Sequence, residues 1–165
     1  LFKKAKALKD FRRKTGTRGP TRDRILIVCE GKKTEPNYFK GFRLTNVTVD
    51  GKGYNTDSLV RQVIKLKKNA IKSKEEFDRV WCVFDRDSFS PENFKTAISL
   101  ARSNNIQIAY SNEAFEIWYM LHFNYYDTSF SRDQYGEQLT RLLNHKYRKN
   151  SLNMYEELLE RQNIA

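Results

Sequence analysis

Hydrophobic residues along this chain follow two different spacings. Residues 25–29 (ILIVC) and 80–84 (VWCVF) are uninterrupted apolar runs. Such runs are typical of strands in a parallel sheet that helices cover on both faces. Between them, side chains such as Leu59, Val63 and Leu66 recur at the spacing of one helical face. The pattern therefore predicts strands that alternate with amphipathic helices.

Turn and capping residues divide this pattern into elements. The expected strands are residues 23–30, 47–50, 79–85 and 106–111. The expected helices begin at Thr34, near residues 55–56, at Ser90 and at Asn112, and two more are expected around residues 134–144 and 153–163. Thr34 is the expected N-cap of the first helix, because Pro36 then falls in the first turn, where its missing N–H is tolerated. This βαβαβαβα order predicts an α/β fold with a mostly parallel four-stranded sheet flanked by helices.

Composition divides the chain into three expected parts. These are a flexible basic arm (residues 1–22), an α/β core (residues 23–124) and a helical extension (residues 125–165). With 165 residues, of which 13% are aromatic, the chain is long enough to bury one hydrophobic core. The sequence stops within an expected helix, so we expect the extension to be truncated.

Positive charge is concentrated at the N-terminal end. Residues 1–24 hold ten Lys and Arg against two Asp, and so carry eight of the eleven net positive charges. A segment of this kind, with Arg12, Arg13 and Lys14 at its centre, can bind the phosphates of nucleic acid through counterion release. The alternative is a solvated tail that keeps the protein soluble. The acidic residues described next favour nucleic acid.

The two cysteines and the lack of long apolar segments indicate the compartment. Cys29 and Cys82 each fall within an expected buried strand, and their spacing suggests neither zinc binding nor a disulfide. We expect free thiols in a reducing environment. Because the sequence has neither a secretory signal nor a long apolar span, we expect a cytoplasmic protein that does not contact membranes.

Acidic residues follow two of the buried strands directly. Glu30 comes after the first apolar run, and Asp85 and Asp87 end the third strand. In open α/β sheets, ligands bind beyond the carboxyl ends of the strands. Extended backbone places Asp85 and Asp87 on the same side of the strand, so both carboxylates can reach one cation. Oxygen ligands of this type select Mg²⁺ or Mn²⁺.

Other charged residues near these acids have two interpretations each. Lys32, Lys33 and Arg86 can hold phosphate groups beside the acids, although strand-to-helix turns often carry such residues without a function. Glu30 is expected to bind metal or to act as a general acid/base, since an unpaired buried carboxylate is costly. Acids near helix starts, such as Glu35, are sufficiently explained by the helix dipole.

Three ordered motifs carry a family resemblance. Residues 27–39 (IVCEGKKTEPNYF), 83–89 (VFDRDSF) and 111–123 (SNEAFEIWYMLHF) together resemble the RloB-like family. The resemblance implies a Toprim-like, that is Rossmann-like, domain of the kind found in restriction and phage-defence loci, and a defence-system partner such as an ATPase.

The same resemblance assigns roles to the acids. It implies that Glu30 is an acid/base or metal ligand, that Asp85 and Asp87 form the metal pair, and that Glu116 is the acid of the third motif. Glu113 stands where the family is expected to have a proline. That departure leaves open whether Glu113 or Glu116 faces the metal.

Two functions from different classes follow. The first is a Mg²⁺-dependent nuclease with Glu30, Asp85, Asp87 and Glu116 as the catalytic and metal-binding set. The second is a non-catalytic module in which the basic arm and the core bind nucleic acid or a partner protein and the acids hold a structural cation. A phosphatase with an aspartyl nucleophile is disfavoured, because its Asp-x-Asp would follow the first strand rather than the third.

Overall fold

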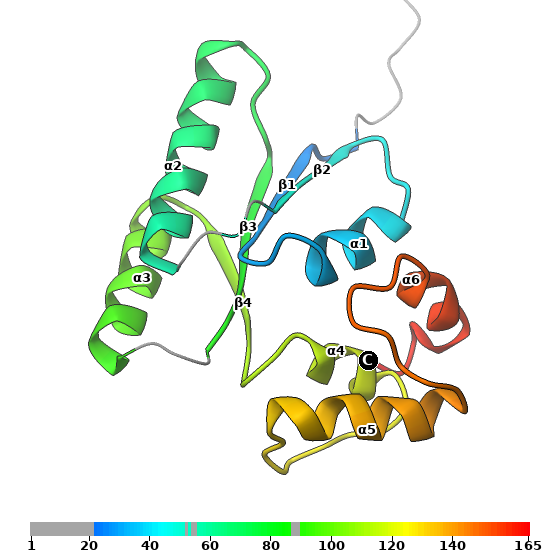
Figure 1. Cartoon of the computed structure of the whole chain (residues 1–165). Coiled ribbons are helices and arrows are strands. Elements are labelled where there is room, and N and C mark those ends of the chain that lie inside the picture. Colours follow the sequence, from blue (N-terminus) through cyan, green and yellow to red (C-terminus); the bar gives the residue numbers. More distant parts are fainter. Residues whose placement is uncertain (1–21, 52, 54–55, 87–89) are drawn as a thin grey trace, which may run out of the picture.

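A four-stranded parallel sheet forms the centre of the molecule (Figure 1). The computed structural model describes residues 22–51, 53, 56–86 and 90–165. The strands are β1 (Ile25–Cys29), β2 (Val47–Gly51), β3 (Arg79–Asp85) and β4 (Gln107–Ser111). They lie in the order β2-β1-β3-β4, and every neighbouring pair is parallel. The predicted α/β fold with a parallel sheet is confirmed.

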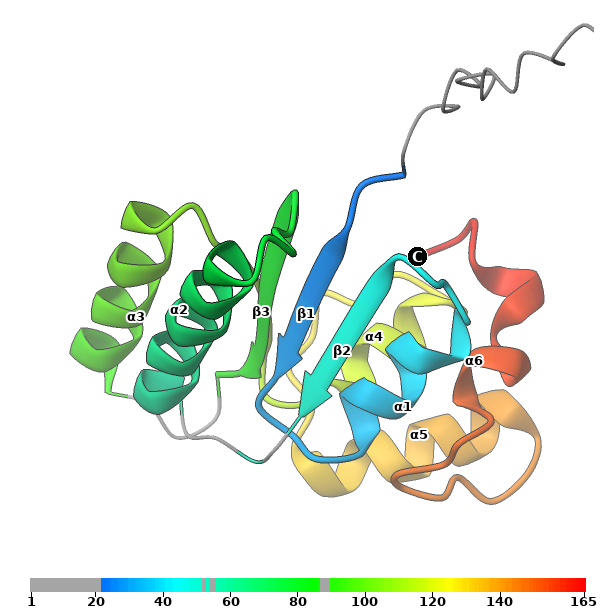
Figure 2. The ribbon, with the colours of Figure 1, turned by 90° about the horizontal axis from the view of Figure 1, so that it is seen from above.

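Helices cover both faces of this sheet. They are α1 (Thr34–Gly41), α2 (Thr56–Lys72), α3 (Pro91–Ser103), α4 (Glu116–Leu121), α5 (Arg132–Leu143) and α6 (Met154–Glu157), followed by the 3₁₀ helix η1 (Leu159–Arg161). Helices α2 and α3 lie on one face, whereas α1 and the helices from α4 onward lie on the other (Figures 1 and 2). Helices fall on opposite faces because the chain winds outward from β1 first toward β2 and then toward β3 and β4.

The two faces of the sheet bury separate apolar cores. Side chains at alternate positions, including Val28, Cys82 and Phe84, pack against α2 and α3. On the other face, Cys29 and Val83 belong to a cluster that the C-terminal helices complete. Its members from α1 and from the part of the chain after residue 125 include Tyr38, Tyr135, Leu139, Met154 and Leu158. Fully burying one side chain such as Leu139 contributes roughly 1.5–3 kcal/mol, so residues after 125 are firmly held against this face.

One predicted helix start and one predicted N-cap are wrong. Helix α1 begins at Thr34 as predicted, but its N-cap residue is Lys33, and the buried Thr34 hydroxyl donates to the side-chain oxygen of Asn150 at 2.8 Å. The fourth helix begins at Glu116 rather than at Asn112, because residues 112–115 form a connection after β4. The last predicted helix is also shorter, since α6 ends at Glu157 and a 3₁₀ turn follows.

Burial makes both cysteines unreactive. Cys29 and Cys82 are free and buried, as expected from their positions in apolar strands. Burial raises the pKa of Cys82 to about 12, and it raises the pKa of Cys29 as well. Both thiols are therefore protonated at neutral pH. Within the described ranges, no helix combines the length and apolar character that crossing a bilayer requires.

Candidate active site

The carboxyl ends of β1 and β3 meet where the winding of the sheet reverses. β1 pairs with β2 on one side and with β3 on the other, so a crevice opens beyond these two strand ends. Glu30 follows β1 directly, and Asp85 is the last residue of β3. The Glu30 carboxylate accepts a hydrogen bond of 3.1 Å from the backbone N–H of Asp85. The predicted convergence of these two residues at one sheet edge is thus observed.

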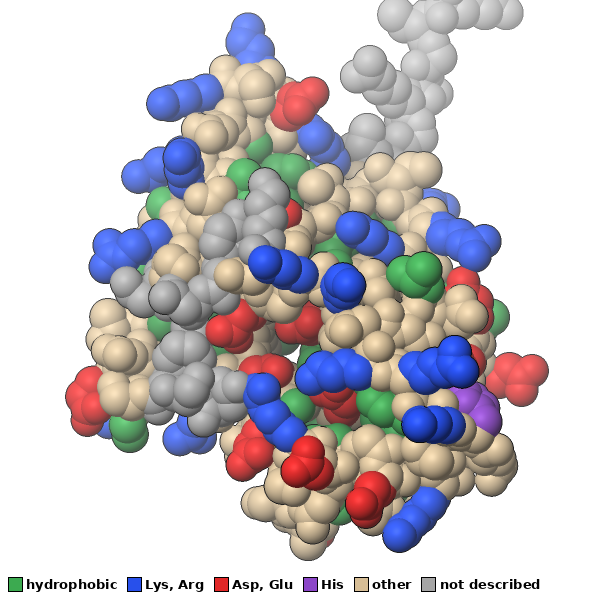
Figure 3. Space-filling model, in the orientation of Figure 1, with side chains coloured by type: hydrophobic (Ala, Val, Ile, Leu, Met, Phe, Trp, Pro, Cys, Tyr) green, Lys and Arg blue, Asp and Glu red, His purple; other side chains and the backbone are tan. Residues whose placement is uncertain are grey.

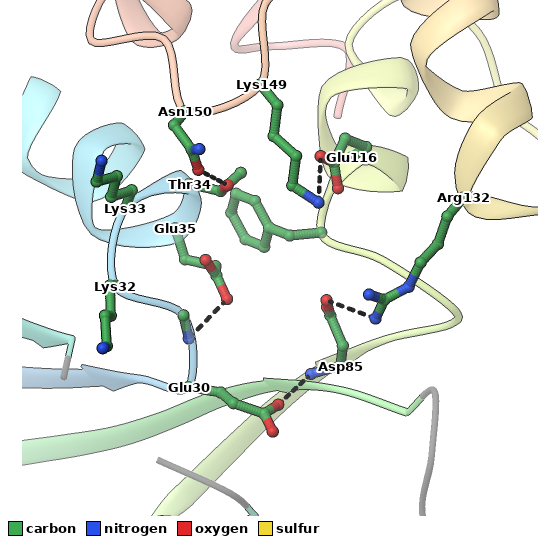
Figure 4. Close-up of a pocket in the computed structure, with 12 residues that line it drawn as sticks. Glu30, Lys32, Lys33, Thr34, Glu35, Asp85, Glu116, Arg132, Lys149 and Asn150 are labelled. Carbon is green, nitrogen blue, oxygen red and sulfur yellow. Dashed lines mark hydrogen bonds and ion pairs between the residues drawn. The ribbon is translucent and has the colours of Figure 1, made fainter. Parts of the chain in front are cut away.

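A cavity of about 440 Å³ lies at this edge (Figure 4). Four carboxylates line it, from Glu30, Glu35, Asp85 and Glu116. Four cations also line it, from Lys32, Lys33, Arg132 and Lys149. Figure 3 shows acidic side chains gathered in a hollow of this face, with Lys and Arg side chains around them. The cavity therefore combines an acidic floor with a cationic border.

The Asp85 carboxylate of the cavity is strongly perturbed. Burial is the main cause that raises its pKa to about 7, and the charges of Glu35 and Glu116 add to the shift. The Ser111 hydroxyl, which donates to Asp85 Oδ1 at 2.8 Å, opposes it. The guanidinium of Arg132, 4.0 Å from Asp85 Oδ2, opposes it less. Perturbed carboxyls in a crevice are a common sign of a functional site.

Glu116 faces the cavity and Glu113 does not. Glu116 is 5% exposed, whereas Glu113 is exposed and lies outside the cavity. The Tyr147 hydroxyl donates to Glu116 Oε1 at 3.1 Å, and the Lys149 ammonium lies 3.6 Å from the same atom. Burial and the nearby Glu116 carboxylate raise the pKa of Tyr147, so this hydroxyl remains a donor. Of the two glutamates, Glu116 is therefore the one whose carboxylate lines the cavity.

Glu35 lines the cavity. Sequence analysis missed this, because it explained Glu35 by its favourable interaction with the helix dipole alone. It is 5% exposed, and Oε1 accepts a hydrogen bond of 3.2 Å from the backbone N–H of Gly31. A Cβ at position 31 would clash with this carboxylate, so any larger residue there would require the Glu35 side chain to move. The Gly31 N–H is therefore occupied by Glu35 rather than open to a phosphate. Burial raises the pKa of Glu35, although the hydrogen bonds from the backbone oppose the shift.

The predicted phosphate-binding residues are placed in different environments. Lys32 and Lys33 line the cavity. Arg86 is exposed and lies outside the cavity, because its guanidinium stacks on the ring of Phe94, 5.0 Å from the centroid. Asp87 and the three arm residues Arg12, Arg13 and Lys14 lie outside the described residues.

Arg132 and Lys149 are cavity residues that sequence analysis did not identify. Both come from the part of the chain after residue 125, which was expected only to extend the fold. Each stands beside one acid of the cavity, Arg132 by Asp85 and Lys149 by Glu116. No motif in the sequence links these residues to the acids, since the connection is made only by packing of α5 and the segment after it.

The donor set is chemically suited to a hard cation. Glu30 and Asp85 offer carboxylate oxygens, which Mg²⁺ and Mn²⁺ prefer. Within the described part of the chain, no three acidic, His or Cys side chains lie close enough together to bind one ion. Glu30 and Asp85 would be the first two ligands, and the predicted third, Asp87, falls outside that part.

These features define a class: doubly wound α/β proteins with an acidic cavity at the point where the winding reverses. The family model described as RloB-like protein matches residues 25–165 of the chain. The chain therefore belongs to the RloB-like family, as its three motifs indicated. A search of curated proteins found no match. The matched range includes Arg132 and Lys149 as well as the four acids.

The raised pKa of Asp85 predicts how stability changes with pH in the absence of metal. The carboxyl has a pKa of about 7 when folded against an ordinary value of 3.8, so the folded state holds its proton more tightly. The stability that Asp85 contributes is therefore present at low pH and is lost as the pH rises through this interval. Urea unfolding at a series of pH values should show a larger loss in the parent than in Asp85→Asn, in which Glu35 still has a raised pKa. If the parent gains stability over the interval relative to the variant, the assignment is wrong.

Proposed function

We propose that this protein is a Mg²⁺-dependent nuclease that hydrolyses phosphodiester bonds of DNA or RNA. The observation that carries the proposal is the meeting of Glu30 and Asp85 at the reversal of the sheet, in one cavity with Glu35 and Glu116. A cavity meant only to bind phosphate would not need four carboxylates on its floor, because they repel an anion. Carboxylates collected in this way favour a cation that mediates between them and the phosphate.

The residues divide into groups that bind metal, hold phosphate and handle protons. Glu30 and Asp85, with Asp87 as the predicted further ligand, would hold a divalent ion, and that ion would supply the charge that polarises a phosphate and acidifies water. Lys149 and Arg132 are placed to hold the non-bridging oxygens of the phosphate. Glu35, buried and with a raised pKa, is placed to accept a proton from the attacking water.

A role in anti-phage defence is proposed from the family alone. The resemblance implies that proteins of the RloB-like family occur in restriction and phage-defence loci, and a defence nuclease would have to be held inactive until infection. A partner such as an ATPase would fit that requirement.

A second candidate is a binding module without catalysis. Two acids of the cavity already have cationic neighbours, because Lys149 lies 3.6 Å from Glu116 and Arg132 lies 4.0 Å from Asp85. These internal cations could neutralise the acids in place of a metal. Calorimetric titration with Mn²⁺ combined with a cleavage assay on a labelled oligonucleotide separates the two candidates. The nuclease binds Mn²⁺ and cleaves, and the Asp85→Asn/Asp87→Asn double variant does neither, whereas the module cleaves nothing whether or not it binds Mn²⁺.

A pair of nearby glutamates provides a matched test of the site. Glu116→Gln should lower metal-dependent cleavage of a labelled oligonucleotide about 100-fold or more, which is the usual range for losing one catalytic carboxylate. Glu113→Gln should cleave like the parent, because Glu113 is exposed and outside the cavity. Thermal unfolding of both variants controls for folding. Equal losses in the two variants, or a greater loss in Glu113→Gln, would show that the cavity is not the site.

A further inference from the structure

The segment between α5 and α6 is strongly basic. This basic loop, residues 144–153, contains Lys146, Arg148 and Lys149 together with His145, and it has no acidic residue. All four of these side chains are exposed. Lys149 reaches the cavity at Glu116, so the loop runs along the border of the site (Figure 4).

Hydrogen bonds fix the basic loop to the walls of the cavity. The Asn150 side-chain oxygen accepts from the Thr34 hydroxyl at 2.8 Å, and its backbone carbonyl accepts from the Asn37 side chain at 3.0 Å. At the other end, the Tyr147 backbone N–H donates to the Thr140 hydroxyl at 3.0 Å, and its phenol donates to Glu116. A loop held in this way pays little ordering entropy when it binds a ligand.

Lys146 and Arg148, the two loop cations that do not line the cavity with the acids, have no acidic partner in the described part of the chain. Lys146 and Arg148 line a second cavity of about 380 Å³, which Lys149 does not line. The one acid that lines it, Glu157, is 3.0 Å from His145. Arg43, by contrast, is a surface cation paired with a carboxylate, that of Glu156 at 3.0 Å. Two unpaired cations on a fixed loop therefore leave a positive surface beside the acidic floor.

We infer that the basic loop binds the backbone phosphates that adjoin the phosphate in the cavity. Lys149 contacts the phosphate at the cavity, while Lys146 and Arg148 contact its neighbours along the strand. Two features favour a polyanion here: the loop carries successive cations rather than a single one, and their charge is not neutralised internally. Arg148 adds a planar group that can hold two phosphate oxygens at once. The inference rests on the proposed function for its ligand but concerns binding rather than cleavage.

Binding measured without cleavage tests this inference. The parent for the test is Asp85→Asn, and the probes are labelled mixed-sequence oligonucleotides of about 30 nucleotides, long enough to span such a surface. Single-stranded and duplex forms of DNA and RNA are separate arms. The variant Lys146→Gln/Arg148→Gln removes two exposed charges. The control Lys65→Gln/Lys68→Gln removes two exposed lysines of α2, which lies on the other face of the sheet and whose lysines have no acidic partner within the described residues.

The loop variant should bind the preferred probe about tenfold more weakly at moderate salt. The plot of log K against log salt has a negative slope, and this slope should become shallower by about 0.7 per lost phosphate contact on a single strand, or by about 0.9 on a duplex. The α2 control should stay within about twofold of the parent. Equal losses in both variants, an unaffected loop variant, or no probe bound by the parent would each overturn the inference. If the loop variant alone loses binding while wild-type protein cleaves nothing with Mg²⁺ or Mn²⁺, the inference stands and the proposed function fails.

Asn150 tests the fixing of the loop separately from its charge. Asn150 adopts φ 65°, a conformation that glycine also accepts, so Asn150→Gly removes the bond to Thr34 without straining the backbone. Binding should weaken while the salt slope stays that of the parent, because every cation remains. A changed slope with unchanged affinity would show that Asn150 does not position the loop.

Discussion

Replacing Asp85 with asparagine should abolish metal-dependent cleavage and leave the protein as stable as before or more stable. Asparagine keeps the shape of the side chain and an oxygen that can accept the 2.8 Å hydrogen bond from Ser111. It removes the negative charge that a divalent cation requires. Cleavage of a labelled oligonucleotide in Mg²⁺ and in Mn²⁺ measures the first effect, and thermal unfolding in a chelator measures the second. Asp127→Asn, the same change at an exposed loop position, is the control.

The expected stability follows from the electrostatics of the cavity. With a pKa of about 7, Asp85 is ionised at pH 8 only at a cost, because it is buried and near Glu35 and Glu116. Each pKa unit corresponds to about 1.4 kcal/mol. The pKa of about 7 already includes the attraction to Arg132. Because Asp85 is partly exposed and the asparagine amide also loses solvation, we expect Asp85→Asn to gain only on the order of 1–2 kcal/mol at pH 8. Severe unfolding of the variant would instead mean that Asp85 serves a structural ion pair with Arg132.

The strands and the positions of Glu30 and Asp85 could be predicted because the apolar residues that show a strand to be buried are consecutive in the sequence. The runs before Glu30 and within β3 have no polar face, so only a sheet covered on both sides accommodates them. Parallel strands end at the same edge, which brings Glu30 to Asp85 without knowledge of any loop. The sequence was sufficient here because the inference needed only the direction of the strands.

The burial of Glu35 and the start of α4 could not be predicted. Both failures have one cause, which is that distant residues form the environment of these positions. An acid in the first turn of a helix is equally favourable in solvent, so its sequence context does not distinguish Glu35 from an exposed residue. At α4, the segment from Asn112 resembles a capped helix start. The Tyr135 hydroxyl nevertheless donates to the Asn112 carbonyl at 2.9 Å, and the helix begins only at Glu116.

The cations of the cavity illustrate the same limit at longer range. Arg132 and Lys149 are separated from Glu30 by about a hundred residues, and neither lies in a motif. Their positions depend on how α5 and the basic loop pack against α1 and α4, through contacts such as Thr34 to Asn150. A pattern of hydrophobic spacing predicts that α5 has a buried side, but it does not specify where the first residue of that helix points.

Removing the basic arm should weaken binding of nucleic acid while leaving the chemistry intact. The structure sets the limit of the deletion at residue 21. Beyond it, the Asp23 carboxylate pairs with Arg79 at 2.9 Å, and the Arg24 backbone N–H donates to Asp78 at 2.7 Å. A deletion that extended through Arg24 would disturb the start of β1 and the turn before β3, and would confuse a loss of contacts with a loss of stability.

Residues 1–21 contain eight Lys and Arg, and a segment of this kind seldom engages every cation at once. If the arm contacts about three phosphates, its deletion should make the negative slope of log K against log salt shallower by about 2.7 on a duplex and by about 2.1 on a single strand. Affinity at low salt should fall at least tenfold, whereas the cleavage rate at saturating substrate should remain that of the parent, because the four acids lie outside the arm. A full-length control with the eight cations changed to Gln distinguishes charge from other contacts. If the deletion leaves both affinity and slope unchanged, the arm is a solubility segment. Its charge then no longer supports the proposal that the substrate is nucleic acid.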